Sequence, residues 1–342
     1  MKARLFGFFV IICVVSLICS VTIPSHAAES VIRLKYSNMN PPTHPLAQLS
    51  DQWCKELEKR TNGRVKVSFF PAGTLVSPAQ TYDGVVKGII DIGWSLMSYT
   101  PGRMPVSEVL SLPLGFKNSA QATRTANALF VKFQPKEFDD TKIFYLHAFA
   151  GGTFHTKAPV NKIEDLKGLR IKGDGYTSKI IAAAGGTPTT MPMMETYDAL
   201  KRGLADGALT PMESLTGWKF GEVCKYTYIN EGAAYANGLF IAMNKEKFNS
   251  LSKDIQQIID KLNDEWFDKQ AKVWKQIDDE ARDSETKAGH KFVTAGPDDV
   301  AKTKEKMKPL FENYSKAMKE KGLPGEEAIK FCQDYLKTAS SD

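Results

Sequence analysis

The chain has 342 residues, and its 45 basic and 39 acidic residues give a formal net charge of +6 at pH 7. This balance is mild, and no run of Lys and Arg with interleaved aromatic residues occurs, so a nucleic acid is a poor candidate for a partner. The length suits two domains of ordinary size.

Residues 1–27 have the pattern of a secretory signal peptide. Lys2 and Arg4 precede an apolar run from residue 5 to residue 23, and Ser25-His26-Ala27 places small residues where a signal peptidase cleaves. The alternative is an uncleaved membrane anchor, which usually needs ~20 strongly apolar residues with stop-transfer flanks. We therefore expect a cleaved, exported and soluble protein, whose net charge falls from +6 to +4 with the loss of those two cations.

Three cysteines remain after cleavage: Cys54, Cys224 and Cys332. They are odd in number and widely spaced, with no CxxC pair, so at most one disulfide can form. We expect three buried free thiols.

The first elements alternate between strand and helix patterns. Residues 31–37 alternate as a strand, and apolar residues at helical spacing follow from His44 until Asn62-Gly63 ends the helix. A second strand covers 64–70, and Ser77-Pro78 opens a helix that Gly88 closes. This rhythm predicts an α/β fold with a mostly parallel sheet, whose ligands bind beyond the carboxyl ends of the strands.

A third strand, 89–94, leads into the loop SLMSYTPGRMP, which therefore lies in the ligand position. Trp94, Ser95 and Tyr99 are candidates for one wall of a site, although ordinary core packing explains the two aromatic residues equally well. Arg103 is expected to be structural and to pair with Glu108.

The middle of the sequence predicts a change of domain. A helix over 119–134 and a strand over 143–150 precede Gly151-Gly152, a plausible hinge, and a short strand at 153–160 follows. His155 in that strand is a lone histidine, for which polar packing and ligand contact are both open.

The stretch from 163 to 213 carries the clearest sign of a ligand site. Arg170 and Lys172 lie two apart on a short strand over 169–172 and so face the same way. Gly173 and Gly175 then turn the backbone into a helix, whose N-terminus favours an anion. An acidic ligand is the simplest occupant; the alternative is that both cations are solvated surface charges.

The last third predicts a long helix. A short helix over 212–220 carries Glu213 and Trp218, strands follow at 226–230 and 238–243, and Asn237-Gly238 marks the return to the first domain. From Ser252 apolar residues keep a helical period for about 36 residues, or ~54 Å at ~1.5 Å per residue. Such a helix must brace both domains, and two amphipathic helices form the tail from residue 297.

Motifs for catalysis or metal binding are lacking: there is no GxSxG, HExxH, P-loop or paired Cys/His spacing. Gly173-x-Gly175-x-x-Ser178 imitates a dinucleotide fingerprint, but its third position is serine and the preceding strand is very short. We expect neither a cofactor nor a metal.

Nine short motifs occur in an order that resembles one family, the DctP-type solute-binding proteins of tripartite ATP-independent periplasmic (TRAP) transporters. The motifs are HPLAQ at 44–48, NGRVKVSFFPAGTL at 62–75, GIIDIGW at 88–94, YTPGR at 99–103, LPLGF at 112–116, EDLKGLRIK at 164–172, GGTP at 185–188, METYDAL at 194–200 and GLADG at 203–207. The resemblance covers everything after residue 30.

The resemblance implies a two-lobed periplasmic binding protein fold with the long helix bridging both domains. Domain I is expected to comprise 28–151 plus about 237–278, and domain II 152–236 plus about 279–342. It also implies a periplasmic receptor that captures a carboxylate-bearing organic acid in the interdomain cleft and delivers it to one small and one large membrane subunit. We expect a monomer that is not an enzyme.

The family usually has an arginine where Lys172 stands, and that arginine forms a two-pronged salt bridge with the ligand carboxylate. Here Arg170 is two residues away instead. A lysine offers one charge-assisted contact, worth ~1.5–3 kcal/mol, but not the planar fork. Either Lys172 holds the carboxylate or Arg170 reaches round to it.

Further site residues follow from the same resemblance. Met193 stands where members place a pocket-lining side chain, Thr210 where an asparagine often contacts the ligand, and Phe154 where some have an arginine. With Trp94 and Trp218 they suggest an acid that has an apolar or planar body.

Asn237, Glu213 and His155 complete the set of ligand-binding candidates. Two other classes of protein stay open. A secreted enzyme acting on an organic acid would need Glu213 or His155 as its acid or base, and a periplasmic sensor or adhesion module would bind a ligand without transport.

Overall fold

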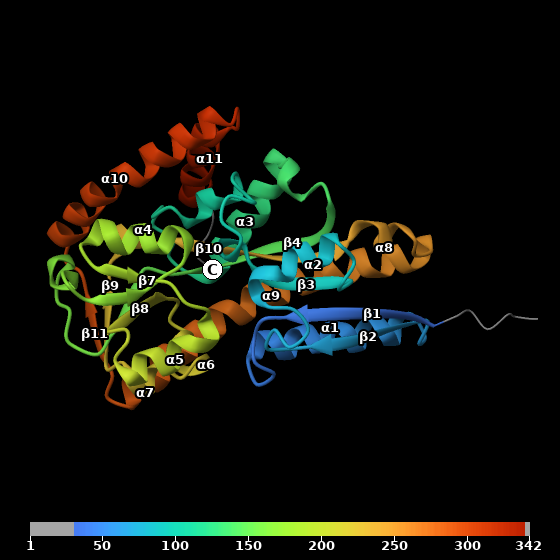
Figure 1. Cartoon of the computed structure of the whole chain (residues 1–342), viewed down its shortest axis with the longest axis horizontal. Coiled ribbons are helices and arrows are strands. Elements are labelled where there is room, and N and C mark those ends of the chain that lie inside the picture. The colour runs from blue at the N-terminus through green and yellow to red at the C-terminus, as the bar shows by residue number, and fades with distance from the viewer. Residues whose placement is uncertain (1–30, 339–342) are drawn as a thin grey trace, which may run out of the picture. The chain divides into compact units, whose positions relative to one another are not determined.

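The computed structural model describes residues 31–338, so the expected signal peptide at 1–27 lies outside the described residues. A first sheet has the strand order β2-β1-β3-β10-β4 (Figure 1). Its strands are β1 (Ile32–Asn38), β2 (Val65–Phe70), β3 (Ile92–Leu96), β4 (Thr141–Ala150) and β10 (Ala236–Asn244).

A second sheet has the order β11-β9-β5-β8-β6-β7. Its strands are β5 (Thr153–Thr156), β6 (Arg170–Lys172), β7 (Thr187–Thr189), β8 (Gly207–Thr210), β9 (Tyr226–Ile229) and β11 (Lys291–Thr294). The strands on either side of Gly151-Gly152 therefore belong to different sheets, which is where the sequence predicts a change of domain.

Helices surround both sheets. They are α1 (Pro45–Arg60), α2 (Thr81–Val86), α3 (Ser119–Phe133), α4 (Gly175–Ala184), α5 (Met193–Arg202), α6 (Ser214–Gly217), α7 (Phe220–Val223), α8 (Lys245–Asn249), α9 (Lys253–Lys287), α10 (Pro297–Glu320) and α11 (Gly325–Thr338). The single helix expected over 212–220 is two short helices, because Lys219 between them has a positive φ of 60°. The two tail helices are confirmed; α10 packs on α4 and α11 on α3.

Both sheets are mostly parallel, as expected, but each contains one strand that runs against the others. β1 is parallel to β2 and β3, but β10 runs antiparallel to both β3 and β4. In the second sheet β5 runs antiparallel to β8 and β9. These two strands, β5 and β10, are the ones that directly follow the crossings at residues 151–152 and 230–235, and each runs against the direction of its neighbours.

Two crossings between the sheets lie side by side. The backbone leaves the first sheet through Gly151-Gly152, and the N–H of Gly151 donates to the carbonyl oxygen of Tyr235, 2.8 Å away, on the return crossing. That return precedes β10, so Asn237-Gly238 is already inside the strand and not at the crossing as expected. Gly238 serves close packing instead of a turn, because a Cβ there would lie 2.8 Å from the sulfur of Met97.

The first helix begins and ends where the sequence predicts. His44 caps α1, its Nδ1 accepting the backbone N–H of Leu46 at 3.2 Å. Asn62 and Gly63 both have positive φ just after the helix, a conformation that only glycine and, less often, asparagine adopt readily.

The long helix is confirmed as α9, with 35 residues. It packs against α1, α3 and β4 of the first sheet and against α6, which follows β8 of the second (Figure 1). Two indoles fix it to the first sheet's layer: Trp266 Nε1 donates to the carbonyl of Leu49 at 2.9 Å, and Trp53 Nε1 donates to Asn263 Oδ1 at 3.0 Å. The helix therefore contacts elements of both sheets.

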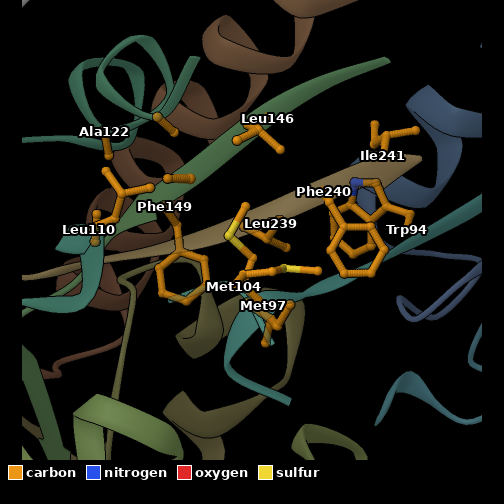
Figure 2. Packing of buried hydrophobic residues seen from close by; sticks show 14 of the residues in the cluster. Trp94, Met97, Met104, Leu110, Ala122, Leu146, Phe149, Leu239, Phe240 and Ile241 are labelled. Carbon is orange, nitrogen blue, oxygen red and sulfur yellow. The ribbon is translucent and has the colours of Figure 1, made fainter. Parts of the chain in front are cut away.

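The buried core of the first sheet gathers where β3, β4 and β10 run together. Figure 2 shows Trp94, Leu146, Phe149, Leu239 and Phe240 packed there, all of them at most 8% exposed. This wall of apolar side chains forms one side of the cavity described below.

The predictions for the three cysteines and for Arg103 can be compared with the structure. Cys54, Cys224 and Cys332 are free and buried, as predicted. Arg103 is structural, but it pairs with Asp140 and lies over the ring of Tyr82; its expected partner, Glu108, accepts the backbone N–H of Gly102 instead. Among residues 31–338, no helix is both long enough and apolar enough to cross a membrane.

Candidate functional site

A cavity lies between the two sheets and takes side chains from both. It holds about 450 Å³ of space between atoms, a size that suits a small molecule. Its lining comprises Met39, Asn40, Trp94, Leu96, Phe149, Lys172, Asp174, Thr177, Met193, Leu209, Thr210, Pro211, Glu213, Trp218, Tyr235, Asn237, Leu239 and Trp274.

The lining sits at the carboxyl ends of strands, as the alternating pattern predicts. Met39 and Asn40 directly follow β1, Lys172 ends β6 and Thr210 ends β8. β6 and β8 are parallel neighbours in the second sheet, so Lys172 and Thr210 lie at the same edge of it, and Met39 and Asn40 line the cavity from the first sheet. Trp274 joins them from the middle of α9.

Lys172 is the cation of the cavity, and it is not alone. Its Nζ donates to Asp174 Oδ2 at 2.8 Å, and the two side chains are only 4% and 7% exposed. Burial acts to lower the pKa of Lys172, but the charge of Asp174 and its hydrogen bond more than offset this and raise the pKa above its usual value. Lys172 is therefore cationic at neutral pH.

Five residues that line the cavity each have a buried polar side-chain atom with no hydrogen-bond partner within the described residues. The atoms are Asn40 Nδ2, Trp94 Nε1, Asp174 Oδ1, Thr210 Oγ1 and Asn237 Oδ1. Buried polar atoms are normally paired, and each one left unpaired costs about 1–3 kcal/mol. Their concentration around one cavity indicates a place built to receive a polar ligand.

Glu213 is the second carboxylate of the lining and is 3% exposed. His44 Nε2 lies 3.1 Å from Glu213 Oε2, and this contact joins the start of α1 to the segment after β8. The backbone N–H of Glu213 donates to Asp278 Oδ1 on α9 at 3.0 Å. Two side chains, His44 at the start of α1 and Asp278 on α9, thus hold Glu213 at the edge of the cavity.

Aromatic rings make up much of the remaining wall. Trp94 stacks on His147 with ring centroids 5.2 Å apart, and Phe149 lies 5.5 Å from Trp274. The Trp274 indole N–H donates to His147 Nδ1 at 3.0 Å, which fixes the ring of this α9 residue against β4. Burial lowers the pKa of His147 to about 3, so its ring is neutral. The walls therefore suit an apolar or planar body.

The sequence matches the family model described as bacterial extracellular solute-binding protein, family 7 (DctP), over residues 36–317. The chain belongs to this family. The DctP family supplies the receptors of TRAP transporters, and the fold seen here is the two-lobed one of such receptors, with one sheet in each lobe.

Three similar proteins show how far this DctP-family protein resembles known receptors. It is 28% identical over 243 residues to the 2,3-diketo-L-gulonate-binding periplasmic protein of Escherichia coli, covering 70% of this chain and 74% of that protein. A TRAP periplasmic solute-binding protein of Desulfovibrio salexigens, with the C-terminus of a symmetry mate in its ligand site, superposes with a TM-score of 0.80 at 31% identity and covers 91% and 98% of the two proteins. A TRAP solute-binding protein of Rhodoferax ferrireducens with copurified benzoate gives 0.82 at 27% identity and covers 90% and 98%.

Most of the residues singled out from the sequence meet in the cavity of this receptor. They are Trp94, Lys172, Met193, Thr210, Glu213, Trp218 and Asn237. The signals that pointed to them differ: Lys172 followed from a strand beside a glycine turn, whereas Met193 and Thr210 followed from the resemblance alone.

Arg170 lies outside the lining of the cavity. It stands at the exposed end of β6, where its guanidinium pairs with Asp206 at 2.8 Å and donates to the carbonyl of Gly203 at 2.7 Å. The hydrogen bond and charge of Asp206 raise the pKa of Arg170 further. Of the two cations that the sequence left as alternatives, only Lys172 is part of the cavity.

Four other candidates do not line the cavity. Ser95 Oγ donates to the carbonyl of Pro78 at 2.8 Å, and Tyr99 Oη accepts the backbone N–H of Met193 at 3.3 Å. Phe154 is fully buried, and His155 bonds to Thr227 Oγ1 at 2.8 Å. Burial lowers the pKa of His155 to about 4. His155 and Glu213 therefore do not form an acid and base pair in one cavity.

Several lining residues were missed from the sequence: Asn40, Phe149, Asp174, Tyr235 and Trp274. Asp174 carried a signal, because it stands between the two glycines that follow Lys172. Trp274 carried a weaker one, because it lies in the helix expected to brace both domains, a signal that Trp266 shares although it packs against α1. No group of His, Cys, Asp and Glu among residues 31–338 is placed to hold a metal ion.

Proposed function

We propose that this TRAP receptor binds a small organic acid in the cavity, with the carboxylate held by Lys172. The single observation that carries the proposal is a buried lysine, cationic at neutral pH, beside buried polar atoms that lack partners within the described residues. The similar structures support it, because one holds benzoate and another holds the C-terminus of a symmetry mate in its ligand site.

The proposal includes closure of two domains around the solute. Domain I would contain 28–151 and about 237–278, and domain II 152–236 and about 279–342. The paired crossings at Gly151-Gly152 and at the segment before β10 are the proposed hinge, since few other backbone segments join the sheets. A solute can favour the closed form only by binding it more tightly than the open form.

We also propose the path of the solute. Residues 1–27 direct export and are cleaved, and the mature protein works as a periplasmic monomer without catalysis. It delivers the solute to the small and large membrane subunits of a TRAP transporter, which supply the energy from an ion gradient. The periplasmic relatives support this placement.

The test is a pair of substitutions on one strand. Lys172→Met removes the cation from the cavity and should weaken binding of organic acids at least ~10-fold, the loss of one charge-assisted contact. Arg170→Gln removes the exposed cation two residues away and should leave affinity unchanged. Isothermal titration calorimetry on the mature protein, with acids found in a thermal-shift screen, measures both.

The two substitutions also decide which of the two cations, Lys172 or Arg170, holds the carboxylate, a question that the sequence left open. If Arg170→Gln abolishes binding while Lys172→Met does not, the site assignment is wrong although the family remains. Circular dichroism of both variants checks folding, because removal of Lys172 leaves Asp174 buried without its partner. Release of a chemically altered acid from the protein would instead indicate an enzyme.

A further inference from the structure

The charge balance of the cavity does not suit a simple anion. Its lining contains one lysine, Lys172, and two carboxylates, Asp174 and Glu213, each at most 5% exposed. The positive charge of Lys172 is already matched by Asp174 at 2.8 Å. A carboxylate that approached Lys172 alone would therefore also meet the negative charge of Asp174, which is unfavourable at short range in a buried site.

The neighbour of Glu213 does not remove this excess of negative charge. His44 Nδ1 accepts the backbone N–H of Leu46, so it carries no proton, and the remaining ring proton is on Nε2. That Nε2–H donates to Glu213 Oε2. His44 is thus a neutral donor and leaves the charge of Glu213 in place.

Asp174 also has a side-chain oxygen that lacks a hydrogen-bond donor within residues 31–338. Asp174 lines the cavity; its Oδ2 accepts from Lys172, whereas its Oδ1 is buried and has no partner among the described residues. An ionised carboxylate oxygen can only accept, so the missing group is an N–H or O–H of the ligand. Because Asp174 touches Lys172, that donor must lie next to the ligand group that Lys172 binds.

An ammonium group beside the ligand carboxylate meets all three conditions. It donates to Asp174 Oδ1, it cancels the charge of the ligand's own carboxylate so that the ligand does not add to the excess negative charge of the lining, and it stands next to the carboxylate at Lys172. Aromatic rings of the wall, Trp94 and Trp274 among them, add a surface that tolerates a cation and an apolar body alike. A hydroxyl group satisfies the hydrogen bond but leaves the charge unbalanced.

We propose that the solute is a zwitterion, an organic acid with a protonated amine next to its carboxylate, in which Lys172 holds the carboxylate and Asp174 the amine. This inference rests on the proposed function and narrows it from organic acids in general to amino acids and related compounds. It assigns Asp174 as the residue that determines specificity.

Matched ligands test the inference. Phenylglycine, mandelate and phenylacetate share one ring and one carboxylate and differ only in having an amine, a hydroxyl or a hydrogen beside it; leucine, 2-hydroxy-4-methylpentanoate and 4-methylpentanoate form a second set. Both enantiomers are used where they exist, and benzylamine serves as the amine without a carboxylate. Calorimetry on the mature protein gives the Kd of each.

In at least one set, we expect the amino acid to bind at least ~10-fold more tightly than the matched hydroxy acid and the matched unsubstituted acid. Asp174→Asn should abolish that preference and strengthen binding of the plain acid, because Lys172 loses its internal counter-ion. Asparagine remains a good N-cap for α4, so the variant should fold, which its thermal melt checks. Asp206→Asn, the same change at the exposed partner of Arg170, should keep the preference.

The outcomes separate the inference from the proposed function. If plain or hydroxy acids bind as tightly as the amino acids, or if Asp174→Asn keeps the preference, the inference of a zwitterionic solute is wrong. The proposal of a carboxylate receptor is then unaffected. If benzylamine binds as tightly as phenylglycine, the carboxylate contact at Lys172 is wrong as well. If no member of either set binds, both are abandoned for solutes of this size.

Discussion

Asp278 shows how a single buried carboxyl at the edge of the site responds to pH. It accepts hydrogen bonds from Ser119 Oγ and from the backbone N–H of Glu213. Burial, with a smaller contribution from the charge of Glu213, raises the pKa of Asp278 to about 7. Its unfolded value is about 4, so the folded protein keeps a proton between pH 4 and 7 that the unfolded one has lost.

This difference predicts a stability that falls as pH rises. The contribution of Asp278 is fully present below pH ~4 and is lost as pH rises through 7, a change of roughly 4 kcal/mol at most. Asp278→Asn cannot ionise, so its unfolding free energy should change less between pH 5 and 8 than that of the parent. Urea unfolding at both pH values measures this; Asp279→Asn, on an exposed neighbour, should leave the parent's slope. An unchanged slope in Asp278→Asn would show that the group is ionised throughout.

At the same scale, the sequence predicted cations better than their partners. Lys172 was visible because a strand residue beside glycines must stand at a sheet edge. Its pairing with Asp174 was not, since whether a carboxylate two residues away faces the lysine depends on the path of the turn at Gly173. Arg170 followed the same pattern as Lys172 and yet pairs with Asp206, which is 36 residues away and outside any local rule.

Among the elements, α9 carries both a structural and a binding role, and two tryptophans separate them. Trp266 packs against α1, whereas Trp274 lines the cavity. Each indole N–H donates one hydrogen bond, so Trp266→Phe and Trp274→Phe should each lower the unfolding free energy by about 0.5–2 kcal/mol. Only Trp274→Phe should also weaken solute binding.

Chemical denaturation and calorimetry on the two variants check this division of roles. Equal loss of affinity in both would mean that α9 acts on the site through its position and not through Trp274. Unchanged affinity in both would remove Trp274 from the wall of the site.

The same helix shows what periodicity can and cannot predict. Its start at Ser252, its length and its need for two neighbours all followed from a long apolar period. The reversed direction of β5 and β10 did not follow from the sequence, because a strand has the same alternation whichever way it runs. The Asn237-Gly238 pair misled for a related reason: glycine here leaves room for Met97, a contact between distant segments.

For the molecule as a whole, the fold places one cavity between two sheets, and the family supplies the reason for that cavity. The sequence located seven of the eighteen lining residues, by family motifs and by the ends of strands. The net charge of the cavity lining could not be predicted from the sequence, because it depends on which carboxylates face the cavity. Asp174 and Glu213 do so, and they make this cavity more acidic than a single buried lysine suggests.

The most direct measurement is a crystal structure of the mature protein with a bound solute from the screen. We predict that the solute fills the cavity between the sheets, with a carboxylate oxygen within hydrogen-bond distance of Lys172 Nζ and with Asp174 Oδ1 newly paired. A solute bound elsewhere, or bound in the cavity with its carboxylate away from Lys172, would contradict this prediction.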